Sequence, residues 1–261
     1  MEVRVLHASG RDVSPAAFGR LLSETGESPA VWQVAEETPV AILVNGESFA
    51  VMMATPEDLE DFATGFAITE GLVESADEIA RLGIAEAADG YVANLRIDPA
   101  RAARAADRRR GRAGRAGCGI CGAQTIEAAL PVPRRVPHRP LPSTAALMAA
   151  REALPAHQHM KRLNRSTHAA AFCRPDGTVE TAREDIGRHN ALDKLAGALA
   201  RAGRDASEGF VLLSSRVSVE MVQKAAAIAA PTLVAVSPPS ALALRMAGRA
   251  GMRVAGFAGE A

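Results

Sequence analysis

The sequence predicts an α/β protein in which helices cover both faces of a sheet. From residue 143 onward, short apolar stretches alternate with amphipathic stretches of helical length, which is typical of a covered sheet. Before that point, stretches of alternating residues flank turn sequences, which predicts a smaller α+β part over 39–98. The chain has 261 residues, enough for one large domain or two small ones.

The smaller part should contain two hairpins and a helix. Residues 39–54 alternate in hydrophobicity around Asn45-Gly46, a typical hairpin turn. Thr55-Pro56-Glu57-Asp58 has the composition of a helix start, with Thr55 as the cap, and Gly71 is a suitable helix stop. A second hairpin is expected over 82–97, with its turn at Asp89-Gly90.

Two segments carry weak periodicity. Residues 1–38 are expected to form an N-terminal leader without firm structure. Residues 99–142 contain an arginine-rich run, a cysteine pair and a proline-rich connector. Because loops longer than about 15 residues tend to be functional or disordered, this segment is expected to be a flexible loop and connector. The α/β/α domain then occupies 143–261.

The elements of the larger domain follow from caps, turns and apolar runs. Ser143 caps a helix that ends near Leu154, and two strands should flank the turn at Pro175-Asp176-Gly177. The expected strands are 168–172, 178–181, 210–213, 233–236 and 253–257, and the later helices are 188–202, 217–229 and 240–250. Ligands of such sheets bind where strands end in loops, so the polar loops 184–190 and 214–218 are candidate binding loops.

Gly117-Cys118-Gly119-Ile120-Cys121-Gly122 places two thiols three positions apart among glycines. Such a pair can hold half of a zinc site, cycle between dithiol and disulfide, or carry sulfur as a persulfide. The run from Arg101 to Arg115 has seven arginines against one acid, and positive charge favours a reactive thiolate. The cysteines alone support two hypotheses equally, a reactive sulfur and a structural metal site.

Both polar loops have a functional and an ordinary interpretation. Ser214-Ser215-Arg216 precedes a helix, where free N–H groups and a guanidinium could bind an anion, although a plain helix cap fits equally well. Arg188 and His189 open the next helix, and His189 shares a face with Asp193. That pair could orient the imidazole, but a surface pair is the favoured interpretation.

A metal site is the alternative for the remaining ligand-type residues. His168 and Cys173 could complete a zinc set with Cys118 and Cys121. They lie five positions apart in an expected strand, and so point to opposite faces, which argues against one shared ion. The zinc deaminase signature is absent, because no His-x-Glu motif begins at His168 and the cysteine pair comes earlier.

Overall charge limits the partners that the chain should bind. Thirty basic residues balance thirty acidic ones, and only 3% of residues are aromatic, so neither nucleic acid nor a membrane surface is an expected partner. No secretory pattern opens the chain and no apolar run reaches membrane-spanning length. The expected location is therefore the cytoplasm, where thiols stay reduced.

Taken together, these motifs resemble the FdhD family of formate dehydrogenase accessory sulfurtransferases. The cysteine motif at 117–122 carries the resemblance first. Further similar stretches are 44–46, 64–71, 167–170, 184–194 and 214–224. The similarity runs from about Pro39 to Phe257. The family usually continues beyond Gly256-Phe257 with a basic residue and glycines, whereas Ala258-Gly259-Glu260-Ala261 follows here.

The resemblance implies a fold and a function. The larger domain should be a three-layer α/β/α sandwich with a mixed sheet, similar to the cytidine deaminase fold. Cys118 would accept sulfur from a cysteine desulfurase as a persulfide, with Cys121 as assistant. The sulfur would pass to the molybdenum bis(molybdopterin guanine dinucleotide) cofactor of a formate dehydrogenase. Residues expected to hold the guanine nucleotide part are Arg188, His189, Ser214, Ser215, Arg216, Gly256 and Phe257.

Three further expectations stay open at the level of sequence. No permanent cofactor and no metal are expected, and a homodimer remains an alternative to a monomer. The competing functional hypothesis is a zinc-bound binding module without turnover. A thioredoxin-type redox enzyme comes third, because its motif normally opens a helix after a strand, whereas this one follows an arginine-rich loop.

Overall fold

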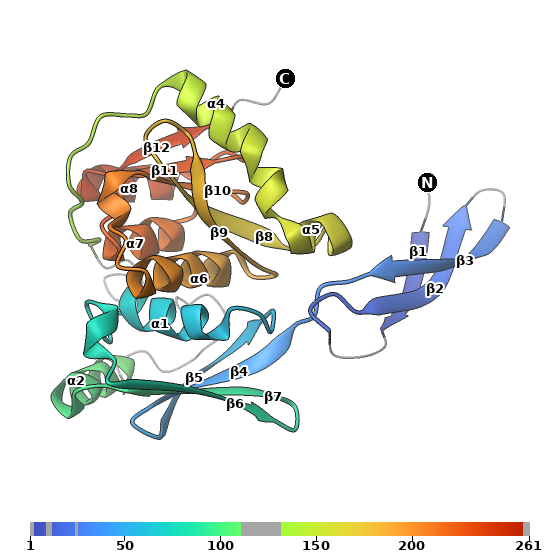
Figure 1. Cartoon of the computed structure of the whole chain (residues 1–261), viewed down its shortest axis with the longest axis horizontal. Coiled ribbons are helices and arrows are strands. Elements are labelled where there is room, and N and C mark those ends of the chain that lie inside the picture. Colours follow the sequence, from blue (N-terminus) through green and yellow to red (C-terminus); the bar gives the residue numbers. More distant parts are fainter. Residues whose placement is uncertain (1–2, 9–11, 24–25, 111–131, 258–261) are drawn as a thin grey trace.

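The computed structural model describes residues 3–8, 12–23, 26–110 and 132–257 (Figure 1). Its main sheet has five strands in the order β12-β11-β10-β8-β9. These are β8 (His168–Cys173), β9 (Val179–Asp185), β10 (Phe210–Leu213), β11 (Thr232–Ala235) and β12 (Arg253–Gly256). β10, β11 and β12 run parallel, whereas β8 is antiparallel to both of its neighbours, so the sheet is mixed.

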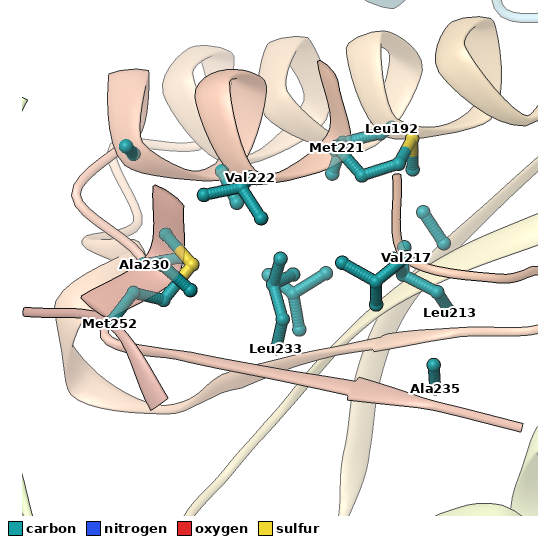
Figure 2. Packing of buried hydrophobic residues seen from close by; sticks show 14 of the residues in the cluster. Leu192, Leu213, Val217, Met221, Val222, Ala230, Leu233, Ala235 and Met252 are labelled. Carbon is teal, nitrogen blue, oxygen red and sulfur yellow. The ribbon is translucent and has the colours of Figure 1, made fainter. Parts of the chain in front are cut away.

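Helices cover both faces of this sheet. On one face lie α6 (Arg188–Arg201), α7 (Val219–Ala227) and α8 (Ala241–Ala250), and on the other lies α4 (Thr144–Ala153). Figure 2 shows Val222 of α7 and Leu233 of β11 pointing toward one another in the first of these cores. The central strands β10 and β11 are buried throughout, as expected for a sheet covered on both faces. The expected three-layer α/β/α architecture is confirmed.

The short elements of this part connect its layers. After α4 the chain forms η2 (Leu154–His157) and α5 (His159–Asn164), and η3 (Ala206–Glu208) precedes β10. The predicted cap at Ser143 is confirmed, because its side chain accepts a hydrogen bond from the Ala146 N–H. Ser240 caps α8 in the same way through the Ala243 N–H.

The smaller part is a four-stranded sheet with the order β5-β4-β7-β6. Its strands are β4 (Thr38–Val44), β5 (Glu47–Ala54), β6 (Arg81–Ala87) and β7 (Gly90–Arg96), and both predicted hairpins are confirmed. Asn45 and Gly46 have φ angles of 54° and 89°, the left-handed values that a tight hairpin turn requires. η1 (Ala76–Glu78) precedes β6.

One helix joins the two parts. α1 (Leu59–Thr69) covers one face of the smaller sheet and packs against α6 on its other side. At the crossing, a Cβ added to Gly65 would lie 1.7 Å from the Asp193 backbone O, and one added to Gly197 would lie 1.9 Å from the Asp61 backbone O. The two helix backbones therefore touch, and only glycine fits at either position.

The start of α1 differs from the prediction. Thr55 is not its cap; Asp58 occupies that position with φ 53° and makes no capping hydrogen bond through its side chain. Thr55 Oγ1 instead accepts from the Ile186 N–H at 3.1 Å. The sequence predicted that this hydroxyl would cap the N–H groups of its own helix. In the structure it bonds instead to Ile186, which lies in the loop before α6.

The prediction of an unstructured leader is wrong. β1 (Val3–Ala8), β2 (Ala16–Ser23) and β3 (Gly26–Gln33) form an antiparallel sheet that extends away from the rest of the molecule (Figure 1). Only one residue of β2 and β3 is buried and the others are half-buried or exposed, so the sheet lacks the strong apolar alternation that sequence patterns detect. Asn164 of α5 donates to Ser14 Oγ at 3.0 Å and ties the sheet to the body.

The expectation of a loop over 99–142 is wrong in its first part, where α2 (Pro99–Arg110) forms. Proline suits the first turn, and Asp98 Oδ1 accepts from the Arg101 N–H at 3.0 Å. Alanines pack this helix against the smaller sheet and give only a weak apolar pattern, which explains why the periodicity was missed. Cys118 and Cys121 lie outside the described residues. None of the described helices is long and apolar enough to cross a membrane.

Candidate functional site

The two candidate polar loops meet at one edge of the main sheet. β8 is antiparallel to β9 and β10, so its first residue lies beside the last residues of both neighbours. His168 is paired in register with Asp185, and Ser214 Oγ accepts from the Ala169 N–H at 2.8 Å. The structure therefore brings the loops 184–190 and 214–218 together, as their positions after strands predicted.

A buried ion pair anchors the first loop. Lys194 Nζ lies 2.8 Å from Asp185 Oδ2, and both side chains are fully buried. The same lysine donates to the backbone O of Thr55 at 3.0 Å, and Asp185 accepts from the Thr55 and Gly187 N–H groups. Asn190 Nδ2 adds bonds to Asp185 and to the Met53 backbone O. Every polar group here has partners, so the cluster holds the start of α6 against the β5–α1 connection.

A second buried pair links three helices. Lys224 Nζ of α7 donates to both carboxylate oxygens of Asp193 at 2.9 and 3.0 Å, and to Thr69 and Glu70 at the end of α1. Burial alone would lower the pKa of Lys224, but the Asp193 and Glu70 carboxylates outweigh it and raise that pKa. The interpretation of Asp193 as half of a surface pair with His189 is wrong, because its side chain is fully buried against Lys224.

Glu184 also has a structural role. Its buried carboxylate accepts from the Met160 and Lys161 N–H groups at 2.8 and 2.9 Å, and from the Thr167 hydroxyl at 3.0 Å. These are the free N–H groups at the start of α5, where a negative charge is favourable. His159 lies 3.4 Å from the same carboxylate. Glu184 therefore serves α5 and is not available to a ligand.

Three side chains at the sheet edge have buried polar atoms without partners. Arg188 Nε, His189 Nε2 and Ser218 Oγ make no hydrogen bond to any described residue. Burial lowers the pKa of His189 to about 4, and the nearby Arg188 and Lys224 cations add to that effect, so the imidazole is neutral at neutral pH. Buried polar atoms are normally hydrogen-bonded, and unpaired ones call for a physical explanation. These three unpaired atoms come from the loops 184–190 and 214–218, the two loops that meet at the sheet edge.

The second loop combines a fixed part and an exposed part. Ser214 is held by its bond with Ala169, and Ser215 Oγ donates to the Arg216 backbone O at 3.2 Å. The N-cap of α7 is Ser218, so the interpretation of Ser214 and Ser215 as ordinary caps is wrong. The Arg216 side chain is exposed. A guanidinium beside a helix start with an unused hydroxyl suits an anionic ligand.

Gly256 and Phe257 end the last strand. The Phe257 N–H donates to the Ala235 backbone O at 3.2 Å, which extends the β11–β12 pairing. Arg151 of α4 lies 4.9 Å above the Phe257 ring, and the ring packs with the core on the α4 face. Arg188 and His189 begin α6 on the opposite face of the sheet. The structure therefore does not bring the Phe257 ring together with them.

The described residues give no support for a metal site. No group of three or more histidine, cysteine or acidic side chains converges among them. Cys173 is fully buried, and burial raises the pKa of its thiol to about 12, which keeps it protonated. Burial lowers the pKa of His168, and the Lys161 and Arg188 cations add to the effect. A zinc set that included Cys118 and Cys121 would extend beyond the described residues.

Sequence reasoning missed the two buried lysines. Lys194 and Lys224 each stand in a helix among apolar residues, and a lysine in an apolar stripe is the signal that could have revealed them. Their acidic partners could not be assigned from sequence, because Asp193 and Lys224 lie 31 positions apart. The unpaired hydroxyl of Ser218 depends on tertiary packing and has no sequence signal.

Fold and site together define an α/β/α protein with a polar edge of the main sheet beside α6 and α7. The chain belongs to the FdhD/NarQ family, whose sequence pattern matches residues 35–261. The resemblance inferred from the motifs is thereby confirmed.

Named relatives and a solved structure agree with this family. The chain is 47% identical over 233 residues to the sulfur carrier protein FdhD of Xanthomonas euvesicatoria pv. vesicatoria, covering 88% of this chain and 83% of that protein. It is 46% identical to the protein of the same name from Cupriavidus necator, with 87% and 83% covered. A solved structure from Desulfotalea psychrophila, described as a formate dehydrogenase accessory protein, shares the fold with a TM-score of 0.71. That pair is 24% identical, over 98% of this chain and 93% of that one.

Proposed function

We propose that this chain is a sulfurtransferase that carries persulfide sulfur from a cysteine desulfurase to the molybdenum bis(molybdopterin guanine dinucleotide) cofactor of a formate dehydrogenase. Relatives named sulfur carrier protein FdhD and the described role of the solved neighbour support this proposal. Reduced thiols are required for such a carrier, so the cytoplasm is the proposed location.

Cys118 is the proposed carrier. Its thiolate attacks the outer sulfur of the persulfide on the donor cysteine. The sulfur–sulfur bond of the donor breaks, a new one forms on Cys118, and the donor leaves as a thiolate that takes up a proton. No net electrons are gained or lost. Cys121 assists, and the arginines around residues 101–115 favour the attacking thiolate through their charge.

The unpaired polar atoms at the sheet edge support the proposal that the chain binds the nucleotide part of the cofactor. Arg188, His189 and Ser218 offer buried polar atoms without partners among the described residues, and Arg216 is an exposed residue of the same loop as Ser218. Guanidinium and hydroxyl donors fit the phosphates of a guanine nucleotide, and a neutral imidazole can donate or accept. The bound cofactor would supply the molybdenum centre that takes up the sulfur. The protein residues would hold and orient its nucleotide end.

Sulfur loading tests the carrier directly. The purified chain is incubated with a cysteine desulfurase and cysteine. Peptide mass spectrometry then shows which cysteine-containing peptides have gained one sulfur atom. Cys118→Ala should abolish loading and activation of the dehydrogenase, whereas Cys121→Ala should retain some loading at Cys118. A Cys118→Ala protein that loads sulfur at Cys121 and still activates the enzyme would overturn the carrier assignment.

Nucleotide binding tests the sheet edge. Calorimetry with GDP should show about tenfold weaker binding to Arg216→Ala, since a charge-assisted hydrogen bond contributes roughly 1.5–3 kcal/mol. Arg81→Ala is the matched control, because Arg81 is an exposed arginine on the smaller sheet. Equal affinity of the wild type and Arg216→Ala would remove Arg216 from the site.

A further inference from the structure

A cavity of about 460 Å³ lies between the end of α1 and the side of α2. Its lining residues are Gly71, Leu72, Glu74, Arg101, Arg104 and Arg134. Half of them are arginines, which come from α2 and from the connector that follows residue 131. None of them belongs to the polar edge of the main sheet, so a different set of residues lines this cavity.

One of the arginines is fixed in position. Arg101 Nη2 lies 2.6 Å from Glu78 Oε1, and Arg101 Nη1 lies 3.7 Å from Glu74 Oε1. The Glu74 side chain is 69% exposed, so that second pair is weak and screened by solvent. When both carboxylates are counted against the three arginines, the cavity still carries net positive charge. The acidic neighbours position Arg101 without neutralising the site.

The other two arginines have no partner in the part of the chain that the structure describes. Arg104 and Arg134 form no ion pair or hydrogen bond with any described residue, and both are exposed. The backbone places Arg134 there, because Pro133 is buried and the Val136 N–H donates to the Ala250 backbone O at 2.9 Å. Converging like charges repel one another, so an anion between them would be stabilising.

We propose that this cavity binds the diphosphate group of a small anion. An arginine guanidinium can donate two parallel hydrogen bonds to two oxygens of one phosphate. The volume of the cavity lies within the range of small-ligand sites. Leu72 is the one large apolar side chain of the lining, so the described lining offers no ring on which a base would stack. The diphosphate itself is therefore the recognised group, whether free or attached to a nucleoside. This inference does not rest on the proposed sulfur transfer.

Calorimetry at low salt with inorganic pyrophosphate tests the site. The measurement uses the full chain with Arg216→Ala, so that phosphate binding at the sheet edge is weakened and contributes less to the signal. Arg134→Ala in this background should weaken pyrophosphate binding about tenfold or more, as expected for losing a charge-assisted bond. Arg135→Ala is the matched control, since Arg135 is an adjacent exposed arginine outside the lining, and it should change affinity less than about twofold.

Two further ligands separate the sources of the diphosphate. Equal affinity for pyrophosphate and GDP identifies the diphosphate alone as sufficient, and tighter binding of GDP identifies a nucleotide. Either result supports the site if Arg134→Ala weakens that binding about tenfold or more. Three results would overturn the proposal: no binding of pyrophosphate in the Arg216→Ala background, equal losses for Arg134→Ala and Arg135→Ala, or Arg134-dependent binding of a polyglutamate peptide in place of pyrophosphate. The last result would make the cavity a docking site for an acidic protein.

Discussion

Two groups of polar side chains lie on α6 and α7, and they differ in their partners. Lys194 and Lys224 are buried, and each meets a carboxylate within 3.0 Å. Arg188 and His189 lie one to two turns before Lys194 in α6. Each keeps a buried nitrogen atom without a partner among the described residues. The first group joins the layers of the fold. The second keeps unused polar atoms, although Arg188, His189 and Lys194 all come from one continuous motif of α6. One sequence motif therefore contains both residues that stabilise the fold and residues whose polar atoms have no partner in the described structure.

The largest expected effect comes from breaking the paired group. Asp193→Ala leaves the Lys224 ammonium buried without its main partner, which should lower the free energy of unfolding by about 3–5 kcal/mol. Urea denaturation measures the change. Glu70→Ala is the control, because it removes a partly exposed partner of the same lysine and should cost about 1 kcal/mol. A loss below about 1 kcal/mol for Asp193→Ala would contradict the structural role.

The next effect concerns the crossing beneath this pair. Gly65→Ala would place a methyl group 1.7 Å from the Asp193 backbone O, so α1 and α6 must move apart. Overpacking of this kind should cost about 3 kcal/mol, again measured by urea denaturation. Gly83→Ala provides the comparison, because a Cβ there meets nothing within 4 Å. Similar stabilities for the two variants would show that the crossing adapts easily.

The buried imidazole of His189 should make the stability of the fold depend on pH. Burial lowers the pKa of His189 to about 4, whereas the unfolded chain binds the proton near pH 6.5. Between these values the unfolded state holds more protons, so stability falls as the pH drops, by about 2 kcal/mol at pH 5. His189→Gln should remove this part of the pH dependence. Urea midpoints at pH 7.5 and 5 provide the measurement, and parallel profiles for both proteins would argue against a buried neutral imidazole.

Arg188 should separate stability from binding. Since its Nε has no partner among the described residues, Arg188→Gln should change the free energy of unfolding by less than about 0.5 kcal/mol. The same variant should bind GDP about tenfold more weakly, because a guanidinium donor is lost. Denaturation and calorimetry on one preparation test both statements. A large loss of stability with unchanged binding would place Arg188 with the structural group.

The smallest effect is expected at Cys173. Burial raises the pKa of its thiol to about 12, so almost no thiolate exists at neutral pH. The folded protein should therefore resist alkylation at this residue, and Cys173→Ala should load sulfur nearly as well as the wild type. Peptide mass spectrometry after treatment with iodoacetamide measures the first expectation. Rapid labelling of Cys173 without denaturant would contradict it.

Local signals in the sequence predicted much of the fold. The hairpin turn at Asn45-Gly46, the cap at Ser143 and the alternation of strands with helices all depend on neighbouring residues, and each is confirmed. α2 escaped prediction because an alanine stripe carries little apolar contrast. The first three strands escaped because their sheet has no large core to impose alternation.

The sequence predicted where the two candidate loops lie, but not what each of their residues does. Loops that follow strands mark where ligands bind in such sheets, and both loops do meet at one edge. The role of each residue depends on partners far away in the chain, such as Thr69 for Asp193. Periodicity indicates which face a residue occupies, but it does not indicate what lies opposite that face.

The backbone contact between α1 and α6 also determines how the chain can be divided. Nine of the eleven residues of α1 are buried, because the helix is covered by the smaller sheet on one side and by α6 on the other. A fragment ending near residue 98 would expose the side of α1 that faces α6, and the complementary fragment would expose α6. Neither piece would keep a closed core of its own, so both parts of the molecule should melt in one transition.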